Sequence, residues 1–112
     1  MEVKASARNL GMSARKVRLI TDRLPGLTVD QAMSLLRYLP SPHAIPVLKV
    51  VRSAAANAES NFDLDIDDLV IKRAFADEGR TAKRFKARSR GRASPILKRS
   101  AHVTIILDER GV

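Results

Sequence analysis

The sequence has no cysteine and no tryptophan, and only four of its 112 residues are aromatic. Without cysteine, the chain can form neither a disulfide scaffold nor a cysteine-based zinc site. No apolar run approaches the ~20 residues that a membrane-spanning helix needs. The first residues, Met1-Glu2-Val3-Lys4, do not have the charged-then-apolar layout of a secretory signal. We therefore expect residues 1–112 to form one cytoplasmic domain with a modest core and no membrane partner.

The aromatic residues are too few for a protein that stacks single-stranded bases on several rings, as single-strand binders usually do. They are Tyr38, Phe62, Phe75 and Phe85. Only Phe85 lies in a segment that is not expected to contribute to the core. Binding of a nucleic acid would therefore rest on its backbone and on the shape of folded strands.

Positive charge is in large excess and is unevenly distributed. The formal net charge is +9, with 21 lysines and arginines against 12 acidic residues. Residues 1–23 carry +4, residues 24–79 carry −3 and residues 80–112 carry +8. Solubility alone requires no such segregation, so we expect both ends of the chain to face an anionic partner while the middle serves as a scaffold.

The stretch from Arg80 to His102 has nine cationic side chains and no acidic one. It is too basic and too poor in apolar residues to pack against its own domain, which indicates a polyanionic partner such as nucleic acid. A solvated, disordered basic loop is the alternative, because highly charged segments often stay unfolded. A second basic group near Arg15 favours binding. The cations of the stretch are Arg80, Lys83, Arg84, Lys86, Arg88, Arg90, Arg92, Lys98 and Arg99.

The first half of the chain predicts one strand followed by three helices. Val3, Ala5 and Ala7 alternate with polar residues, which is typical of a half-buried strand. Ser13 suits the N-cap of the first helix, and Pro25-Gly26 should end it. The helical residues expected to be buried are Val17, Ile20, Leu24, Ala32, Leu35, Leu36, Leu39, Val47, Leu48, Val51, Ala54, Ala55 and Ala58.

Helix boundaries are also marked in the next two helices. Thr28 and Gln31 have the spacing of a capping box, which predicts the start of the second helix. Pro40 should end that helix. Ser41-Pro42 then predicts the start of a third, with a capping residue followed by proline in the first turn. Pro46 leaves that start ambiguous.

The second half predicts two antiparallel strands, residues 69–76 and 97–107, joined by the basic stretch. The whole order predicts an α+β fold in which three helices pack on an antiparallel three-stranded sheet. Residues 80–98 are predicted to form a long extended β-hairpin arm. If residues 79–99 continue the hairpin, the arm projects roughly 30 Å. Gly91 suits a positive φ near its tip, and Gly79 suits a bend at its root.

Five motifs occur in order along almost the whole chain: SARKVR at 13–18, ANAESN at 56–61, DEG at 77–79, GRA at 91–93 and ILKRSAHVT at 96–104. Together they resemble the bacterial large-subunit ribosomal protein twenty-two family, the exit-tunnel β-hairpin proteins. Arg80 stands where that family frequently has proline, and Ser94-Pro95 replaces a more polar pair. Pro95 has no backbone N–H, so strand pairing there is an open question.

The resemblance implies a small α+β domain on the outside of the large ribosomal subunit, near the tunnel exit. It implies a β-hairpin that runs through ribosomal RNA to the wall of the peptide exit tunnel. Such a protein is a structural constituent that aids subunit assembly and is not an enzyme. The implied partners are large-subunit ribosomal RNA, neighbouring ribosomal proteins and nascent peptide near the hairpin tip, with no cofactor and no homo-oligomer expected.

Charge and resemblance together predict a set of RNA-binding residues. Each of two groups also has an interpretation without RNA binding. The basic helix motif would then be a solvated helix face, and Asn57 would be a polar residue near a helix end. The predicted set is Arg8, Ser13, Arg15, Lys16, Arg18, Asn57, Arg80, Lys83, Arg84, Lys86, Arg88, Arg90, Gly91, Arg92, Lys98, Arg99, Ser100 and His102.

Catalysis and metal binding are not expected. His43 and His102 are the only histidines, and neither is accompanied by a recognisable nucleophile and orienting acid. The acidic connector at residues 63–68 lacks the glycine that a calcium loop needs. The competing function is an architectural DNA-binding protein whose basic β-arm enters the minor groove, with Phe85 or Pro95 as an apolar wedge. The long helix has no clear dimer seam, which argues against this DNA-binding function.

Overall fold

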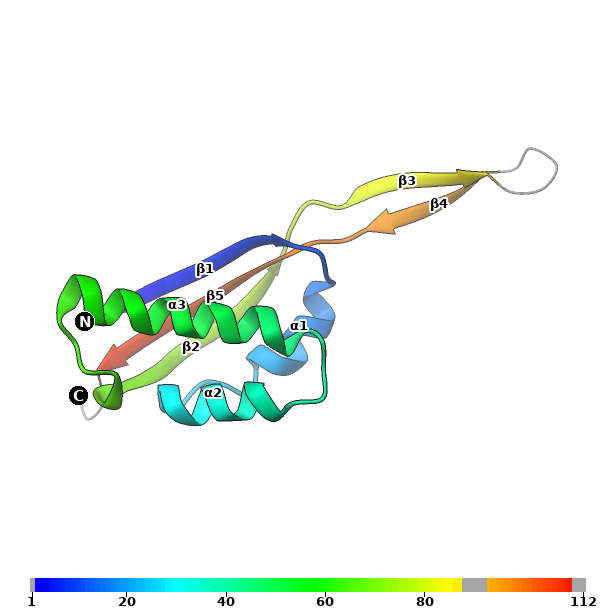
Figure 1. Ribbon diagram of the computed structural model, residues 1–112. Helices are drawn as coiled ribbons and strands as arrows, with labels where there is room; N and C mark the ends of the chain where they lie inside the picture. Colours follow the sequence, from blue (N-terminus) through cyan, green and yellow to red (C-terminus); the bar gives the residue numbers. More distant parts are fainter. Residues whose placement is uncertain (1, 88–92, 110–112) are drawn as a thin grey trace.

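The computed structural model describes residues 2–87 and 93–109, and within residues 82–98 it describes the backbone only. In this part of the chain, three helices pack on a three-stranded antiparallel sheet, and a separate two-stranded ribbon extends from one end (Figure 1). The predicted α+β class is confirmed. The elements are β1 (Val3–Leu10), α1 (Ala14–Thr21), α2 (Val29–Tyr38), α3 (Ala44–Phe62), the 3-10 helix η1 (Ile66–Asp68), β2 (Leu69–Glu78), β3 (Ala82–Ala87), β4 (Ala93–Lys98) and β5 (Ala101–Glu109).

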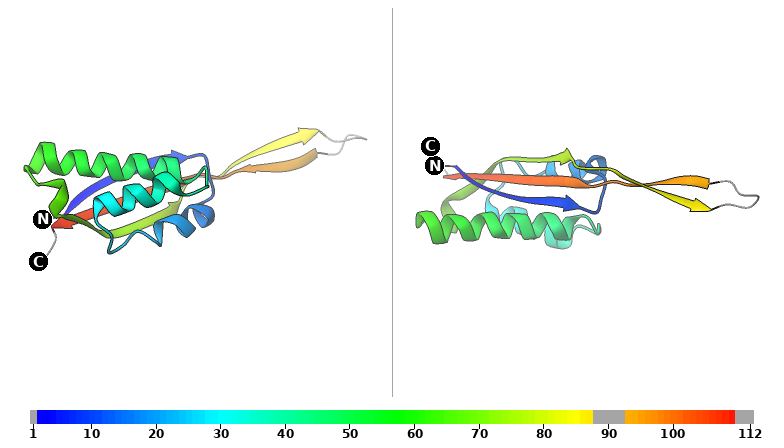
Figure 2. Two further views of the ribbon diagram at one scale, coloured as in Figure 1. Left: turned by 60° about the horizontal axis from the view of Figure 1, so that its bottom comes forward. Right: turned by 90° about the horizontal axis from the view of Figure 1, so that it is seen from above.

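The sheet has the order β1-β5-β2, so the last strand lies at its centre. Val103, Ile105 and Leu107 of β5 are fully buried and face the helices. Thr104 and Ile106 on the other face are also buried, because β5 is flanked by a strand on each side. The longest helix, α3, runs along one face of the sheet (Figure 2).

The first helix ends earlier than predicted. Pro25-Gly26 was expected to end it, but α1 stops at Thr21. The chain then turns and pairs with β2 through two hydrogen bonds. The Gly26 N–H donates to the Ile71 carbonyl oxygen at 2.8 Å, and the Ile71 N–H donates to the Leu27 carbonyl oxygen at 2.8 Å. This pairing with the edge of β2 replaces the last helical turn, and Leu24 still reaches the core.

Two predicted helix starts are confirmed, and one needs correction. Ser13 occupies the N-cap of α1 as predicted, although its hydroxyl makes no capping hydrogen bond within the described chain. Helix α3 begins at Ala44 and not at Ser41-Pro42, because the Ser41 hydroxyl accepts from the His43 N–H in a local turn. The capping box of Thr28 and Gln31 is present in both directions, with distances of 3.1 and 3.2 Å.

The helical stripes form the core largely as predicted. Val17, Ile20, Ala32, Leu36, Val47, Val51, Ala54, Ala55 and Ala58 are buried, whereas Leu35, Leu39 and Leu48 are half-buried against the same core.

The predicted strand at residues 97–107 is wrong as a single element. It is interrupted at Arg99-Ser100, which separates β4 in the ribbon from β5 in the sheet. On the other side, residues 79–81 separate β2 from β3. The ribbon is therefore a ladder of its own, in register from Ala82 opposite Lys98 to Ala87 opposite Ala93. Pro95 lies within β4 opposite Phe85, which answers the question of pairing there.

Candidate nucleic-acid interface

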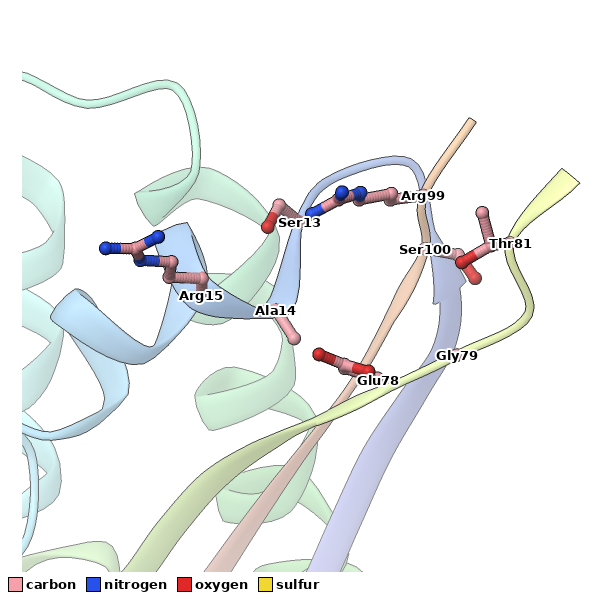
Figure 3. A pocket seen from close by; sticks show the side chains of 8 residues that line it. All are labelled: Ser13, Ala14, Arg15, Glu78, Gly79, Thr81, Arg99 and Ser100. Atoms are coloured by element: carbon pink, nitrogen blue, oxygen red, sulfur yellow. The ribbon is translucent and has the colours of Figure 1, made fainter. Parts of the chain in front are cut away.

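A cavity of about 380 Å³ lies where the ribbon leaves the body (Figure 3). It brings together the start of α1, the end of β2 and both connections to the ribbon. Its lining residues are Ser13, Ala14, Arg15, Glu78, Gly79, Thr81, Arg99 and Ser100. Four of these, Ser13, Arg15, Arg99 and Ser100, belong to the RNA-binding set predicted from the sequence.

Backbone contacts hold the two connections together beside this cavity. The Gly79 N–H donates to the Ser100 carbonyl oxygen at 2.9 Å. The Ser100 hydroxyl donates to the Arg80 carbonyl oxygen at 2.6 Å. These two bonds join the outgoing and returning chains just after the sheet ends, so they define where the ribbon begins.

His102 is part of this junction and not only a surface residue. Its Nδ1 accepts a hydrogen bond from the Asn9 N–H at 3.1 Å. Asn9 lies in the irregular part of the β1–β5 pairing, between Ala7 and Leu10, and has a positive φ of 57°. The imidazole therefore satisfies a backbone donor that the ladder leaves unpaired, which is a structural role that the sequence did not predict.

Arg18 also has an intramolecular partner. Its Nε donates to the Ala76 carbonyl oxygen of β2 at 2.8 Å, across 58 residues of sequence. This bond ties α1 to the outer edge of the sheet. Arg15 and Lys16, on the same helix, are exposed and have no hydrogen bond or ion pair within the described chain. The three cations of the motif thus differ in how freely they can reach a partner.

The ion pairs between described residues lie at the opposite end of the body. Lys72 pairs with Glu2 at 2.7 Å and with Asp108 at 3.7 Å, and Arg73 reaches Glu2 at 3.7 Å. The hydrogen bond from Lys72 and its charge hold the pKa of the Glu2 carboxyl below its ordinary value, and the same contacts raise the pKa of Lys72. Among the described residues, Arg15, Arg80 and Arg99 have no such pairing with an acid.

The remaining predicted residues fall into four groups. Arg8 is exposed on β1, next to the irregular pairing that His102 caps. Asn57 lies far from the cavity. The carbonyl of its neighbour Ala58 accepts a hydrogen bond from the Leu64 N–H, near the start of β2. The cavity lies at the other end of β2, ten residues along that strand. Lys83, Arg84, Lys86 and Lys98 lie on the ribbon strands, while Arg88, Arg90, Gly91 and Arg92 fall outside the described residues.

The sequence prediction missed Glu78 and Thr81. Both line the cavity, and Glu78 is the only acid among the described residues that line it. The sequence does show a change of charge at Asp77-Glu78, but this change indicates only where the basic stretch begins and not that Glu78 lines a cavity. The position of Glu78 beside α1 depends on how that helix packs on β2, which no local pattern specifies. No group of three metal-ligating side chains, and no helix long and apolar enough to cross a membrane, occurs in the described ranges.

The fold and the site define a class: a small basic α+β protein whose unpaired cations gather at the root of a basic two-stranded ribbon. The chain belongs to the family described as ribosomal protein L22p/L17e, whose sequence model matches residues 5–108. This confirms the resemblance seen in the motifs.

Named relatives agree over nearly the full length. The large ribosomal subunit protein uL22 of Clostridium novyi (strain NT) is 49% identical over 110 residues, which cover 98% of this chain and 99% of that protein. The protein of the same name from Dehalococcoides mccartyi (strain BAV1) is 51% identical over 107 residues, covering 96% and 98%. That of Pediococcus pentosaceus is 46% identical over 107 residues, covering 96% and 91%.

Proposed function

We propose that this protein is a structural constituent of the large ribosomal subunit, that it binds ribosomal RNA, and that it acts in the cytoplasm. Its membership of the L22p/L17e family carries the proposal. The charge distribution supports it, since residues 80–112 carry +8 while the central scaffold carries −3. Cationic side chains bind a folded RNA mainly through its phosphates, with release of counterions.

The ribbon and the end of the body near its root make up the proposed RNA-binding surface. The unpaired Arg15, Arg80 and Arg99 lie near the root, and the ribbon adds the cations of β3 and β4. The ribbon would pass between RNA segments that are distant in sequence and hold them together, which would aid subunit assembly. Its tip would line the nascent-peptide exit tunnel, with neighbouring ribosomal proteins around the body.

Membership of this family also bears on the functions considered from the sequence. It is a family of ribosomal proteins and not of enzymes. It favours ribosomal RNA over the minor groove of DNA as the partner of the basic ribbon. The proposed role requires no catalytic residue and no cofactor.

The experiment is to follow the tagged full-length protein through a sucrose gradient and to map its crosslinks to RNA. We expect it to sediment with large subunits and whole ribosomes, with ultraviolet crosslinks from the ribbon and from the cavity region to ribosomal RNA. Sedimentation as free protein, or with chromosomal DNA, would contradict the proposal. Co-sedimentation without RNA crosslinks from the ribbon would contradict the RNA-binding part alone.

A further inference from the structure

The cavity at the ribbon root contains one acid among cations. Glu78 is the last residue of β2 and lies on the same face of that strand as Ala74 and Ala76, toward the helices. Figure 3 shows its carboxylate and the Arg99 side chain on opposite sides of the hollow, while Arg15 points away from it. Glu78 has neither a hydrogen bond nor an ion pair with any described residue.

A phosphate alone does not suit this arrangement. The Arg99 guanidinium and the hydroxyl of Ser13, which makes no capping bond within the described chain, could receive an anion. An anion beside the Glu78 carboxylate would be repelled, because like charges at close range are unfavourable. A ligand that fits the whole cavity therefore presents an anionic group to Arg99 and hydrogen-bond donors to Glu78. The volume of about 380 Å³ lies within the roughly 300–1,000 Å³ of small-molecule sites.

We propose that this cavity binds an unpaired guanine nucleotide of RNA. The Glu78 carboxylate accepts from the N1–H and the N2 amine of the base, and Arg99 binds its phosphate. Unpaired bases in RNA are recognised on their Watson–Crick edges in this way. The inference deepens the proposed function and rests on it, since it adds a base-specific contact to phosphate binding.

Guanine is selected by the geometry of donors. A carboxylate has two acceptor oxygens and no donor when ionised. Guanine presents two adjacent donors on its Watson–Crick edge, which match the two oxygens. Adenine and cytosine each place one amine beside a ring acceptor, and uracil places one N–H between two acceptors. Only guanine gives Glu78 two hydrogen bonds without an opposed acceptor.

The test is a titration of ¹⁵N-labelled full-length protein with 5′-GMP, followed by amide shifts, in buffer that contains EDTA. We expect the shifts to centre on Ser13, Ala14, Glu78 and Gly79. IMP keeps N1–H but lacks the N2 amine, so it should bind roughly tenfold more weakly than GMP, as expected for the loss of one hydrogen bond to a charged group. AMP, CMP and UMP should bind more weakly than GMP as well.

Two variants separate the base contact from general charge effects. Glu78→Gln should abolish the preference for GMP over IMP. Asp77→Asn removes the same charge from the neighbouring residue, which lies outside the cavity, and should retain the preference. If Glu78→Gln does not fold, the comparison of GMP with IMP on the unaltered protein still decides the matter.

Three results would overturn the inference. Equal affinity for all nucleotides and inorganic phosphate would show an anion site only. A GMP response that appears only with Mg²⁺ would assign the carboxylate to a metal ion. A Glu78→Gln variant that melts earlier but keeps its preference for GMP would show that Glu78 only offsets the positive N-terminus of α1. None of these results would affect RNA binding by the ribbon, which is measured separately by crosslinking.

Discussion

The backbone of Gly79 is in direct contact with Ser100: its N–H donates to the Ser100 carbonyl oxygen at 2.9 Å, and a Cβ at position 79 would lie 2.5 Å from the Ser100 Oγ. The same Cβ would meet the His102 Cε1 at 3.0 Å. Glycine is needed here because of this close approach and not because of a positive φ. The chain can thus bend out of the sheet while the two connections stay hydrogen-bonded.

Replacing Gly79 with alanine should therefore destabilise the junction. The Ser100 hydroxyl is held by its bond to the Arg80 carbonyl, so it cannot move aside without losing a partner. Overpacking of this kind costs about 1–3 kcal/mol of unfolding free energy. Urea denaturation should show it. Adding Ser100→Ala to Gly79→Ala should recover part of the loss, and a Gly79→Ala protein as stable as the original would refute the contact argument.

Arg18 and Arg15 make a matched pair for separating stability from RNA binding. Arg18→Ala should lower the free energy of unfolding by about 1 kcal/mol, because it removes a partly buried hydrogen bond from a charged group to the Ala76 carbonyl. Arg15→Ala removes the same charge but no intramolecular bond, so it should stay within about 0.5 kcal/mol of the original protein. The measurement is urea denaturation of both variants; equal losses would show that the Arg18 bond contributes nothing.

Local signals explain which parts of the fold could be predicted. The capping box of Thr28 and Gln31 and the helical stripes depend on neighbours in sequence, and they appear as expected. The break at Arg99-Ser100 does not, because the alternation of apolar and polar residues predicts a single strand over 97–107, whereas the connection there contacts a distant residue, Gly79. The same applies to His102, whose partner Asn9 lies 93 residues away.

The ion pairs at the far end of the body predict a pH dependence. The pKa of Glu2 is lowered in the folded state, so its contribution is present above its unfolded pKa and is lost as pH falls through the folded pKa. The pKa of Lys72 is raised, so its contribution is lost as pH rises through its folded pKa.

Lys72→Met should thus lower the melting temperature most around neutral pH, and the difference from the original protein should shrink in acid. Because the groups are exposed, salt should reduce the difference too. The control is Lys49→Met, because Lys49 is exposed and has no ion pair with a described residue. It should show no such pH dependence. A Lys72→Met effect that is the same in acid and at neutral pH would argue against the pair.

In the free protein, amide hydrogen exchange should be faster in the ribbon than in the body. An isolated two-stranded ribbon is marginal in water, and β3 and β4 pair only with each other among the described strands. We expect fast exchange at residues 82–87 and 93–95 and slow exchange in the helices and in β5. Protection of the ribbon equal to that of β5 in free protein would show that it is stable without RNA.

Removing the ribbon should change how RNA binding depends on salt. Deletion of Ala82 to Ser94 leaves every residue of the core cluster in place, so the body should still fold. It removes six cations: Lys83, Arg84, Lys86, Arg88, Arg90 and Arg92. Each phosphate neutralised on a duplex adds roughly 0.9 to the slope of log affinity against log salt, and somewhat less on a single strand. The slope should therefore flatten markedly in the deletion protein.

A second variant separates charge from length, since a shortened ribbon can also lose binding by failing to reach its site. Changing the same six cations to glutamine keeps the ribbon and removes its charge. Binding of both variants to large-subunit RNA should be measured over a salt series, and both should lose slope while keeping weak docking through Arg15, Lys16 and Arg18. A glutamine variant that keeps the original slope would show that the ribbon does not bind phosphate, and would contradict the proposed role of the ribbon in RNA binding.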